Sequence, residues 1–562
     1  MTSGTLARAV ALSFFLLPAL AGANSRERSE LGKGDGSASF QVHYPPDPVN
    51  VKNANFYLPN TDLSFPAPGF SLEIERSYNS RSLDDGAFGF GWTFNYDIYV
   101  RVGDDGLPEV VDSDGFVCKF VPQNGGAKSA QDASVSQYIA AKRDQDVRSG
   151  INHPADYYET LKSRVINDPK LLDQLKKDLP GITIEPAEGS YISTTRGVQQ
   201  LEIRKEGYKR TFNNGVTHIF FKSGKLRQMI DPTGHTLNMK YSKGATGDLV
   251  EVAHSAGPVL SFQVNASGKI TRATDPEGHV VEYKYDGNHN LIGYKDVTGK
   301  VTHYEYDEWH NMTKIVFPNG DTIFNKYNVE KDWILAQKGP GEHITTYEYG
   351  TDPTDDSHYW TVVDEDGVKS RYDYYDAQNR VVTTDPSGAK TDKTFSECCG
   401  KPLKVIEPDG RIVNYEYDKK GNATRIWDNR GQNVRYEYDP RWNKVAKVVT
   451  PRGSTQYLYD GAGNLVEGRD SSGEIIRLEY TADGRVKAVD GGNGQAFEFR
   501  YNPAGKPIQI NQRGGKGAVI IEYSPEGNVT AVKTAGQVDQ RQVLGDLQRL
   551  IQLVEPAYKF EL

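Results

Sequence analysis

The sequence predicts a protein dominated by β-structure, in which a long antiparallel sheet of β-hairpins coils into a spiralling shell. An N-terminal β domain and a small α-helical insertion are expected in addition. Three observations predict this fold class. Tyrosine pairs recur about every 21 residues over more than half of the chain. Gly-containing turns separate short runs in which apolar and polar residues alternate. The 562 residues include 33 Tyr and 56 Gly, which favours short aromatic strands between tight turns.

Residues 1–23 are predicted to be a secretory signal peptide. Arg8 supplies the positive end, Ala9 to Leu20 is apolar, and Ala21-Gly22-Ala23 is a small-x-small cleavage site. The mature chain would then begin at Asn24, with no membrane span after cleavage. An uncleaved anchor is the alternative, but the apolar run is short for a span. We therefore expect a secreted or cell-surface protein, with the periplasm as the alternative.

Three cysteines, Cys118, Cys398 and Cys399, are too few for a disulfide scaffold. The adjacent pair could form a strained vicinal disulfide. The favoured interpretation is two small side chains in a strand or turn.

Residues 127–182 interrupt the β pattern and predict a helical insertion. Ser134 could cap a helix over Val135–Val147, and Pro154 could begin a second one. Asp168-Pro169 is a favourable N-cap and N1 pair for a third. The insertion would either dock a partner or pack as a lid on the end of the sheet.

Residues 190–534 form the predicted array of about 15 units of about 21 residues. One marker, the second aromatic residue of each Tyr-x-Tyr pair with Phe or Val as stand-ins, identifies each unit. The markers are Phe221, Tyr241, Val264, Tyr285, Tyr306, Tyr327, Tyr349, Tyr375, Phe395, Tyr417, Tyr438, Tyr459, Tyr480, Tyr501 and Tyr523. Most intervals are 20 to 23 residues, and the one before Tyr375 is 26.

Each unit contains two predicted turns. One follows the marker, as in Asp460-Gly461-Ala462-Gly463-Asn464, and the other lies between strands, as in Asp275-Pro276-Glu277-Gly278. Tyr304 and Tyr306 point to the same side of their strand, so stacked units form aromatic rows on one face. Because strands twist against their neighbours, the sheet must coil, and we expect neighbouring coils to cover each other's apolar face.

Residues 535–562 contain a predicted amphipathic helix. Val543, Leu547, Leu550 and Val554 form one apolar stripe. Folding back as a cap on the array is the favoured interpretation. Docking to a separate protein is the alternative.

Two motifs together resemble the RHS/YD-repeat family, which includes bacterial RHS proteins and teneurin-like YD shells. The stretches "YDGAGNL" and "YDKKGNA" resemble YD repeats, and "FYLPNTDLSFPAPGFSLEIERSYNSRSLDDGAFGFGWTFNYD" resembles the domain that opens many bacterial RHS proteins. The resemblance covers roughly Val49 to Val532, apart from the insertion. It implies a β-spiral shell around a cavity and assigns residues 45–126 to an RHS-type N-terminal β domain.

In the family, such shells often enclose a C-terminal toxin, which aspartates in a D-P-x-G-x core box cut loose. Here the D-P-x-G matches begin at Asp231, Asp275 and Asp385, all in mid-repeat turns, and no core box follows Tyr523. The cleavage chemistry is therefore not carried over. Because the array is short for a sealed container, we expect a partial or open shell.

We expect no catalytic, cofactor-binding or metal-binding residues, and no cofactor. The acidic stretches 112–115 and 364–367 hint at calcium but complete no EF-hand loop. His289, His303 and His310 have no metal-ligand spacing. Nearly every turn carries Asp, so paired carboxylates do not indicate a glycosidase.

The expected function is that of an exported, non-enzymatic RHS/YD-repeat protein. Its partial β-shell would serve as a binding or adhesion surface or as an encapsulating scaffold. The alternative is a truncated or split carrier component of a toxin-delivery system, and a secreted hydrolase is the least favoured class. Expected partners are a protein or carbohydrate ligand or a separately encoded RHS partner. The net charge of −9 argues against nucleic acid.

Overall fold

The computed structural model describes residues 42–554, apart from gaps at 44–48, 68, 104, 124–126, 180–181, 183, 194–197, 329, 397–399, 482–484, 493, 503–505, 524–528 and 538. The predicted signal peptide (1–23) and both Cys398 and Cys399 lie outside the described residues. Cys118 is buried. Within the described ranges, no helix combines the length and the hydropathy needed to cross a membrane.

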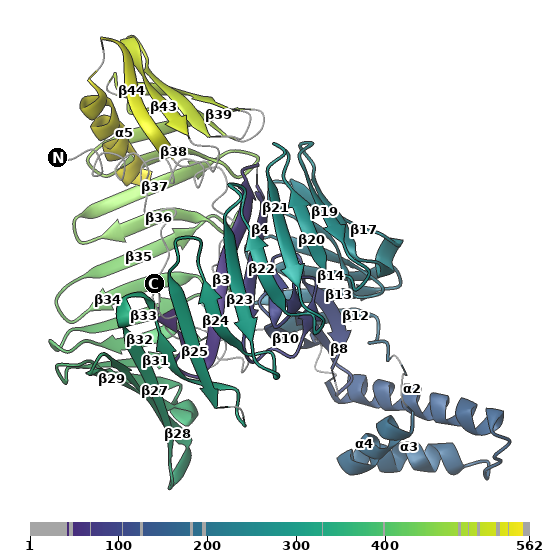
Figure 1. Ribbon diagram of the computed structural model, residues 1–562. Coiled ribbons are helices and arrows are strands. Elements are labelled where there is room, and N and C mark those ends of the chain that lie inside the picture. Colours follow the sequence, from purple (N-terminus) through teal and green to yellow (C-terminus); the bar gives the residue numbers. More distant parts are fainter. Residues whose placement is uncertain are drawn as a thin grey trace.

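A small β domain begins the described chain (purple in Figure 1). Its five-stranded sheet has the order β1-β2-β3-β4-β7, and a three-stranded sheet has the order β10-β9-β8. The strands are β1 (Val42–His43), β2 (Val49–Asn50), β3 (Asn55–Phe65), β4 (Leu72–Asn79), β5 (Asp85–Gly86), β6 (Gly89–Phe90), β7 (Trp92–Phe94), β8 (Tyr99–Val102), β9 (Pro108–Val111) and β10 (Val117–Lys119).

Three helices follow, α2 (Ala127–Arg148), α3 (Tyr157–Asn167) and α4 (Pro169–Asp178). They share a small apolar core of their own. Figure 1 shows them projecting away from the sheet, so they do not lie over its end as a lid. The Asp168 side chain accepts hydrogen bonds from the backbone N–H groups of Lys170 and Leu171, which confirms the predicted cap.

Two predicted helix starts are wrong. Ser134 lies inside α2 and is buried, because good helix formers such as Ala127 and Ala130 continue the helix in the N-terminal direction. The second helix begins at Tyr157, one turn after Pro154, whose carbonyl accepts the Tyr157 N–H.

One 34-stranded antiparallel sheet makes up the rest, with every strand beside its sequence neighbour. This confirms the predicted fold class, a coiled sheet of hairpins (Figure 1). Its strands are β11 (Val121–Pro122), β12 (Gly189–Ser193), β13 (Gln199–Arg204), β14 (Gly207–Phe212), β15 (Thr217–Phe221), β16 (Leu226–Ile230), β17 (Thr236–Tyr241), β18 (Leu249–His254), β19 (Val259–Val264), β20 (Ile270–Thr274), β21 (Val280–Tyr285), β22 (Leu291–Lys295), β23 (Val301–Tyr306), β24 (Met312–Val316), β25 (Thr322–Asn328), β26 (Trp333–Lys338), β27 (Ile344–Asp352), β28 (Asp355–Glu365), β29 (Val368–Tyr375), β30 (Arg380–Thr384), β31 (Lys390–Phe395), β32 (Pro402–Ile406), β33 (Ile412–Tyr417), β34 (Ala423–Asp428), β35 (Asn433–Tyr438), β36 (Val445–Thr450), β37 (Gly453–Tyr459), β38 (Leu465–Asp470), β39 (Ile475–Tyr480), β40 (Val486–Asp490), β41 (Ala496–Tyr501), β42 (Pro507–Gln512), β43 (Lys516–Tyr523) and β44 (Val529–Gln537).

The marker tyrosines hold successive units together. The hydroxyl of Tyr306 donates to the carbonyl of Leu291 on the preceding strand at 2.9 Å. The ladder also shifts register between Glu305 and Tyr306, and such bulges bend a strand and increase its twist. The same hydrogen bond, each across 15 residues, joins Tyr241 to Leu226, Tyr285 to Ile270, Tyr327 to Met312, Tyr349 to Ile334, Tyr417 to Pro402, Tyr438 to Ala423, Tyr480 to Leu465 and Tyr501 to Val486.

In several units an aspartate directly follows the marker and closes the next turn. One carboxylate oxygen of Asp307 accepts the N–H groups of Trp309 and Asn311, both at 2.9 Å. Asp385 does the same in a mid-repeat turn with Ser387 and Ala389. Both turns of the unit therefore use Asp as a local acceptor, which is the capping role that the sequence predicted.

One predicted marker is displaced by a residue. In β29 the inward-facing tyrosines are Tyr372 and Tyr374, both buried, whereas Tyr375 faces outward and stacks on His358. The preceding hairpin, β27 and β28, is longer than the others, and its added residues change the phase of the strand.

The inner face of the sheet, defined as the face that carries the inward tyrosines, is covered first by the N-terminal β domain. The buried Arg76 binds the carboxylate of Asp62 at 2.5 Å and donates to the Tyr304 hydroxyl at 3.2 Å. The Tyr283 hydroxyl donates to the same carboxylate at 2.7 Å. Because desolvation alone disfavours both charges, each ion depends on the other and on these hydroxyls.

The helix α5 (Gln540–Val554) covers the inner face of the last strands. The predicted apolar stripe is buried, and α5 packs along β38 and β39 (Figure 1). This confirms that the helix folds back on the array. At its end, the Tyr457 hydroxyl donates to the carbonyl of Leu553.

The expectation that neighbouring coils cover each other's apolar face is wrong. Where the inner face is buried, other parts of the chain bury it. The first and last coils instead meet through their turns, as where the Asn213 side-chain amide donates to the carbonyl of Lys420. The N-terminal β domain and α5 occupy the inner side of the sheet, which leaves the turns as the places where the coils touch.

Substitution of Gly468 tests how closely α5 packs against β38. A Cβ atom at this position would lie 2.8 Å from Cγ1 of Val554 and 3.1 Å from Cγ2 of Ile476. Gly468→Ala should therefore cost about 1–3 kcal/mol of unfolding free energy and loosen α5. Denaturant unfolding and amide hydrogen exchange would measure this.

Val554→Ala should restore part of that loss in the double variant, because it removes the clashing methyl group. Gly461→Ala, where the added Cβ meets nothing within 4 Å, is the matched control. If Gly468→Ala and Gly461→Ala both lower the unfolding free energy by the same small amount, Val554 of α5 does not pack closely on Gly468.

Candidate binding surface

The middle of the inner face is covered by neither the N-terminal β domain nor α5. One apolar core extends from the β domain to Phe395 on β31, and the other begins at β36. Figure 1 shows β32 to β35 as the stretch of sheet between these two covered regions.

We call five apolar and aromatic residues on the inner face of this stretch the open wall: Val405, Tyr415, Ile426, Val434 and Tyr436. Cross-strand pairing places them on one face: Tyr415 lies opposite Ile426, and Ile426 lies opposite Val434. All five are half-buried. Among the described residues, Val405, Tyr415 and Ile426 belong to neither core, whereas Val434 and Tyr436 pack against the edge of the second one.

The equivalent tyrosines elsewhere show that this exposure is local. Tyr283, Tyr304 and Tyr457, each the first of its pair, are 3% exposed. Tyr415 and Tyr436 occupy the same position in their units but remain half-buried. The difference therefore comes from what covers the face and not from the repeat itself.

The open wall is electrically neutral. Partial burial raises the pKa of the Tyr415 and Tyr436 hydroxyls, so both stay protonated. Charged side chains border it: Lys393 of β31 lies opposite Val405, and at the start of β33 Arg411 binds Asp428 at 2.8 Å and Glu407 at 3.3 Å. Such a surface suits apolar and aromatic groups with a few hydrogen bonds from hydroxyls.

The acidic stretches considered for calcium serve structural roles. Asp112 forms a bidentate ion pair with the fully buried Arg210 of β14. Asp366 accepts hydrogen bonds from His343 and from the N–H of Ile344. These contacts join separate segments of the chain.

Each of the three histidines considered as metal ligands has its own separate surroundings. His289 binds Asp85 at 2.7 Å, and His310 stacks on Phe90 and contacts Asn290. His303 is exposed. The expectation that the chain has no catalytic, cofactor or metal residues stays a prediction.

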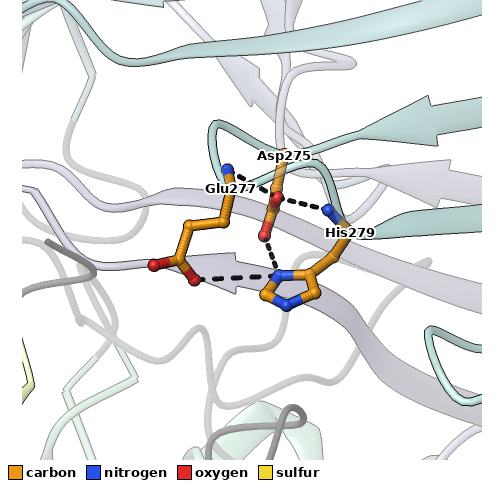
Figure 2. Close-up of side chains that lie close together, drawn as sticks. All are labelled: Asp275, Glu277 and His279. Atoms are coloured by element: carbon orange, nitrogen blue, oxygen red, sulfur yellow. Dashed lines mark hydrogen bonds and ion pairs between the residues drawn. The ribbon is translucent and has the colours of Figure 1, made fainter.

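One cluster was missed by sequence reasoning: Asp275, Glu277 and His279, whose ligand atoms lie within 4.8 Å of one another (Figure 2). The His279 ring nitrogen Nδ1 is 2.8 Å from Asp275 and 3.8 Å from Glu277. The signal was available as the spacing D-x-E-x-H. However, Asp275 also accepts two backbone N–H groups of its own turn, as Asp385 does without a histidine. The arrangement is therefore explained by the turn, and we assign no metal to it.

A small acidic pocket in the β domain is lined by Asp84, Asp85 and Asp97 among others. Burial, and then the neighbouring Asp84, raise the pKa of Asp97 to about 6. The ammonium group of Lys269 binds Asp85 at 2.5 Å and anchors this side of the β domain. The pocket is thus part of the attachment between domain and sheet.

Known families match two parts of the chain. Residues 46–120 match a domain of unknown function (DUF6531). Residues 264–299, 285–322 and 417–455 match the RHS Repeat family, in the hairpin units described above. No curated protein matches the sequence.

Two solved structures show a weak likeness that extends over most of this chain. One, the crystal structure of TcdB2-TccC3-TEV, is 11% identical, with a TM-score of 0.34 over 86% of this chain and 28% of that one. Another, a Photorhabdus luminescens Tc holotoxin pore, is 10% identical, with a TM-score of 0.25 over 86% of this chain and 32% of that one. Scores this low do not establish a shared overall fold. The chain spans about a third or less of either protein.

The buried His218 on β15 gives a pH prediction. Burial, and then the adjacent Arg210, lower its pKa to about 3, and its Nδ1 atom has no hydrogen-bond partner among the described residues. The folded-state pKa lies below the unfolded value of about 6.5, so protonation favours unfolding. This contribution is complete above pH 6.5 and is lost toward pH 3, by up to about 1.4 kcal/mol per pH unit.

His218→Phe should therefore flatten the fall in unfolding free energy between pH 6.5 and 4.5, measured by denaturant titration at several pH values. His303→Phe, at an exposed position, is the control and should leave the slope unchanged. An unchanged slope in His218→Phe would show that this histidine does not destabilise the fold in acid.

Proposed function

We propose that this chain, an RHS-repeat protein, is an exported, non-enzymatic scaffold that holds part of a polypeptide against its open wall. The observation that carries the proposal is the half-exposed aromatic and aliphatic face of β32–β35, which lies between the two stretches of inner face that carry buried apolar cores. Export rests on the signal pattern of residues 1–23.

Binding fits the open wall better than catalysis does. Its side chains are aliphatic groups and protonated phenols, none of which is a strong acid, base or nucleophile near neutral pH. Beside it, Arg411 is held in ion pairs with Asp428 and Glu407, and Lys393 lies opposite Val405. We therefore assign the surface a holding role and no reaction.

A polypeptide fits the wall better than a sugar does. Val405, Ile426 and Val434 have no hydrogen-bonding side chain, and they separate the two tyrosines. A carbohydrate would leave many hydroxyls unsatisfied over this surface. Apolar side chains of a peptide would instead gain about 25 cal/mol for each Å² removed from water.

A second candidate function is a carrier component completed by a separately encoded chain. The observation that favours it is the last strand, β44, which has β43 on one side and no strand of the described residues on the other. Such an edge presents unpaired backbone groups and can be extended by a strand from another chain. Mixed assembly with a β-rich partner would support this function.

Replacing two wall residues tests the primary proposal. The variant Tyr415→Ser, Ile426→Ser should bind a permanently unfolded polypeptide, reduced and carboxymethylated α-lactalbumin, at least about tenfold more weakly than the natural chain. Each lost side chain removes apolar area that contributes up to about 1.5–3 kcal/mol when fully buried. Fluorescence anisotropy of the labelled polypeptide would give both dissociation constants.

The matched control is Leu403→Ser, Leu458→Ser, which removes exposed apolar side chains outside the open wall. It should bind like the natural chain. Equal weakening by both variants, or no binding by the natural chain, would count against a polypeptide site. Binding of a glycan in place of the polypeptide would favour adhesion.

A further inference from the structure

We propose that residues 555–562, Glu-Pro-Ala-Tyr-Lys-Phe-Glu-Leu, dock on the open wall as an internal occupant that a client must displace. This inference rests on the proposed function of the wall. It adds the identity of one occupant and the kind of sequence that the wall accepts.

The first argument for this docking is that α5 ends close to the open wall. Val554, its last residue, packs on Gly468 of β38, and the carbonyl of Leu553 accepts the Tyr457 hydroxyl of β37. Both contacts are on the inner face, at the boundary of the covered region. Only β36 separates β37 from the first strand of the open wall, β35.

The length of the segment carries the second step. Eight residues in extended form span up to about 26–28 Å. Neighbouring strands are about 4.8 Å apart, so the five steps from β37 to β32 cover roughly 24 Å. A segment that leaves α5 at Val554 can therefore cross the whole open wall.

The third argument is the alternation of apolar and charged residues in the segment. Pro556 disfavours a helical conformation at Glu555 and cannot extend the hydrogen bonding of α5. After it, Tyr558, Phe560 and Leu562 alternate with Lys559 and Glu561. In an extended chain this alternation places three large apolar side chains on one side and the charges on the other.

The chemistry of the wall matches that side. Val405, Ile426 and Val434 offer aliphatic surface, and Tyr415 and Tyr436 offer rings that can pack against Tyr558 and Phe560 in offset or edge-to-face contacts. None of the five wall side chains is charged, and Lys393, opposite Val405, borders them on the β31 side. The clients that compete for it would be extended peptides with bulky apolar residues at alternate positions.

Photo-crosslinking in the full chain tests the docking. With p-benzoylphenylalanine in place of Phe560, irradiation should give intramolecular crosslinks to peptides within residues 403–438, identified by mass spectrometry. The same group in place of Gln552, an exposed position on α5, is the control and should not crosslink to that range. Crosslinks from position 560 elsewhere in the chain, or only between two molecules, would overturn the inference.

Competition provides a second measurement. A labelled peptide of sequence Glu-Pro-Ala-Tyr-Lys-Phe-Glu-Leu should bind the variant Tyr558→Ser, Phe560→Ser about tenfold more tightly than the natural chain, because its internal competitor is weakened. Adding Ile426→Ser should abolish the gain. Equal binding by the natural and the double-variant chains would overturn the inference.

The two proposals fail separately. If unfolded α-lactalbumin binds the wall while position 560 crosslinks elsewhere, only the docking of residues 555–562 is wrong. If position 560 crosslinks to the wall but no polypeptide binds even after weakening of the segment, the holding function is wrong.

Discussion

The structure depends on one constraint. The hairpins carry their aromatic side chains on one face of the sheet, and this face is exposed unless other parts of the chain cover it. The repeat supplies its own backbone hydrogen bonds, its turns and its curvature, but not this cover. The N-terminal β domain and α5 bury the two ends of the face. The open wall is what these two covers leave exposed, so the candidate binding surface follows from the same constraint that shapes the fold.

The β domain is attached by a buried polar centre as well as by apolar packing. Arg76 and Asp62 are each nearly inaccessible, and hydroxyls from β21 and β23 add hydrogen bonds to them. A buried ion pair adds little net stability, but breaking it is costly, so it favours one register of domain against sheet. We regard this ion pair as the feature that determines how far the N-terminal β domain extends over the inner face. The mutual position of domain and open wall would then be the same in every molecule.

The aspartates illustrate how repetition can conceal or imitate a functional site. Many of those described in the array accept backbone N–H groups two and four residues later, as Asp307 and Asp385 do. The Asp275 cluster has the spacing of a metal site, yet its aspartate makes these same contacts. In such a chain, a carboxylate indicates a catalytic or metal site only where it is not already used to accept the backbone N–H groups of its own turn. The departures from the repeat, such as the exposure of Tyr415, are more informative.

The sequence by itself determined the local features: the two-strand unit, its Asp turns, the inward tyrosine rows and the apolar stripe of α5. Each depends on residues close together in the chain, where periodicity and turn chemistry act directly. Only the tertiary structure decided that Arg76 meets Tyr304, that Tyr374 and not Tyr375 faces inward, and that β32–β35 stay uncovered. These depend on small twists and bulges that accumulate over 34 strands and on where two distant segments come to lie against them.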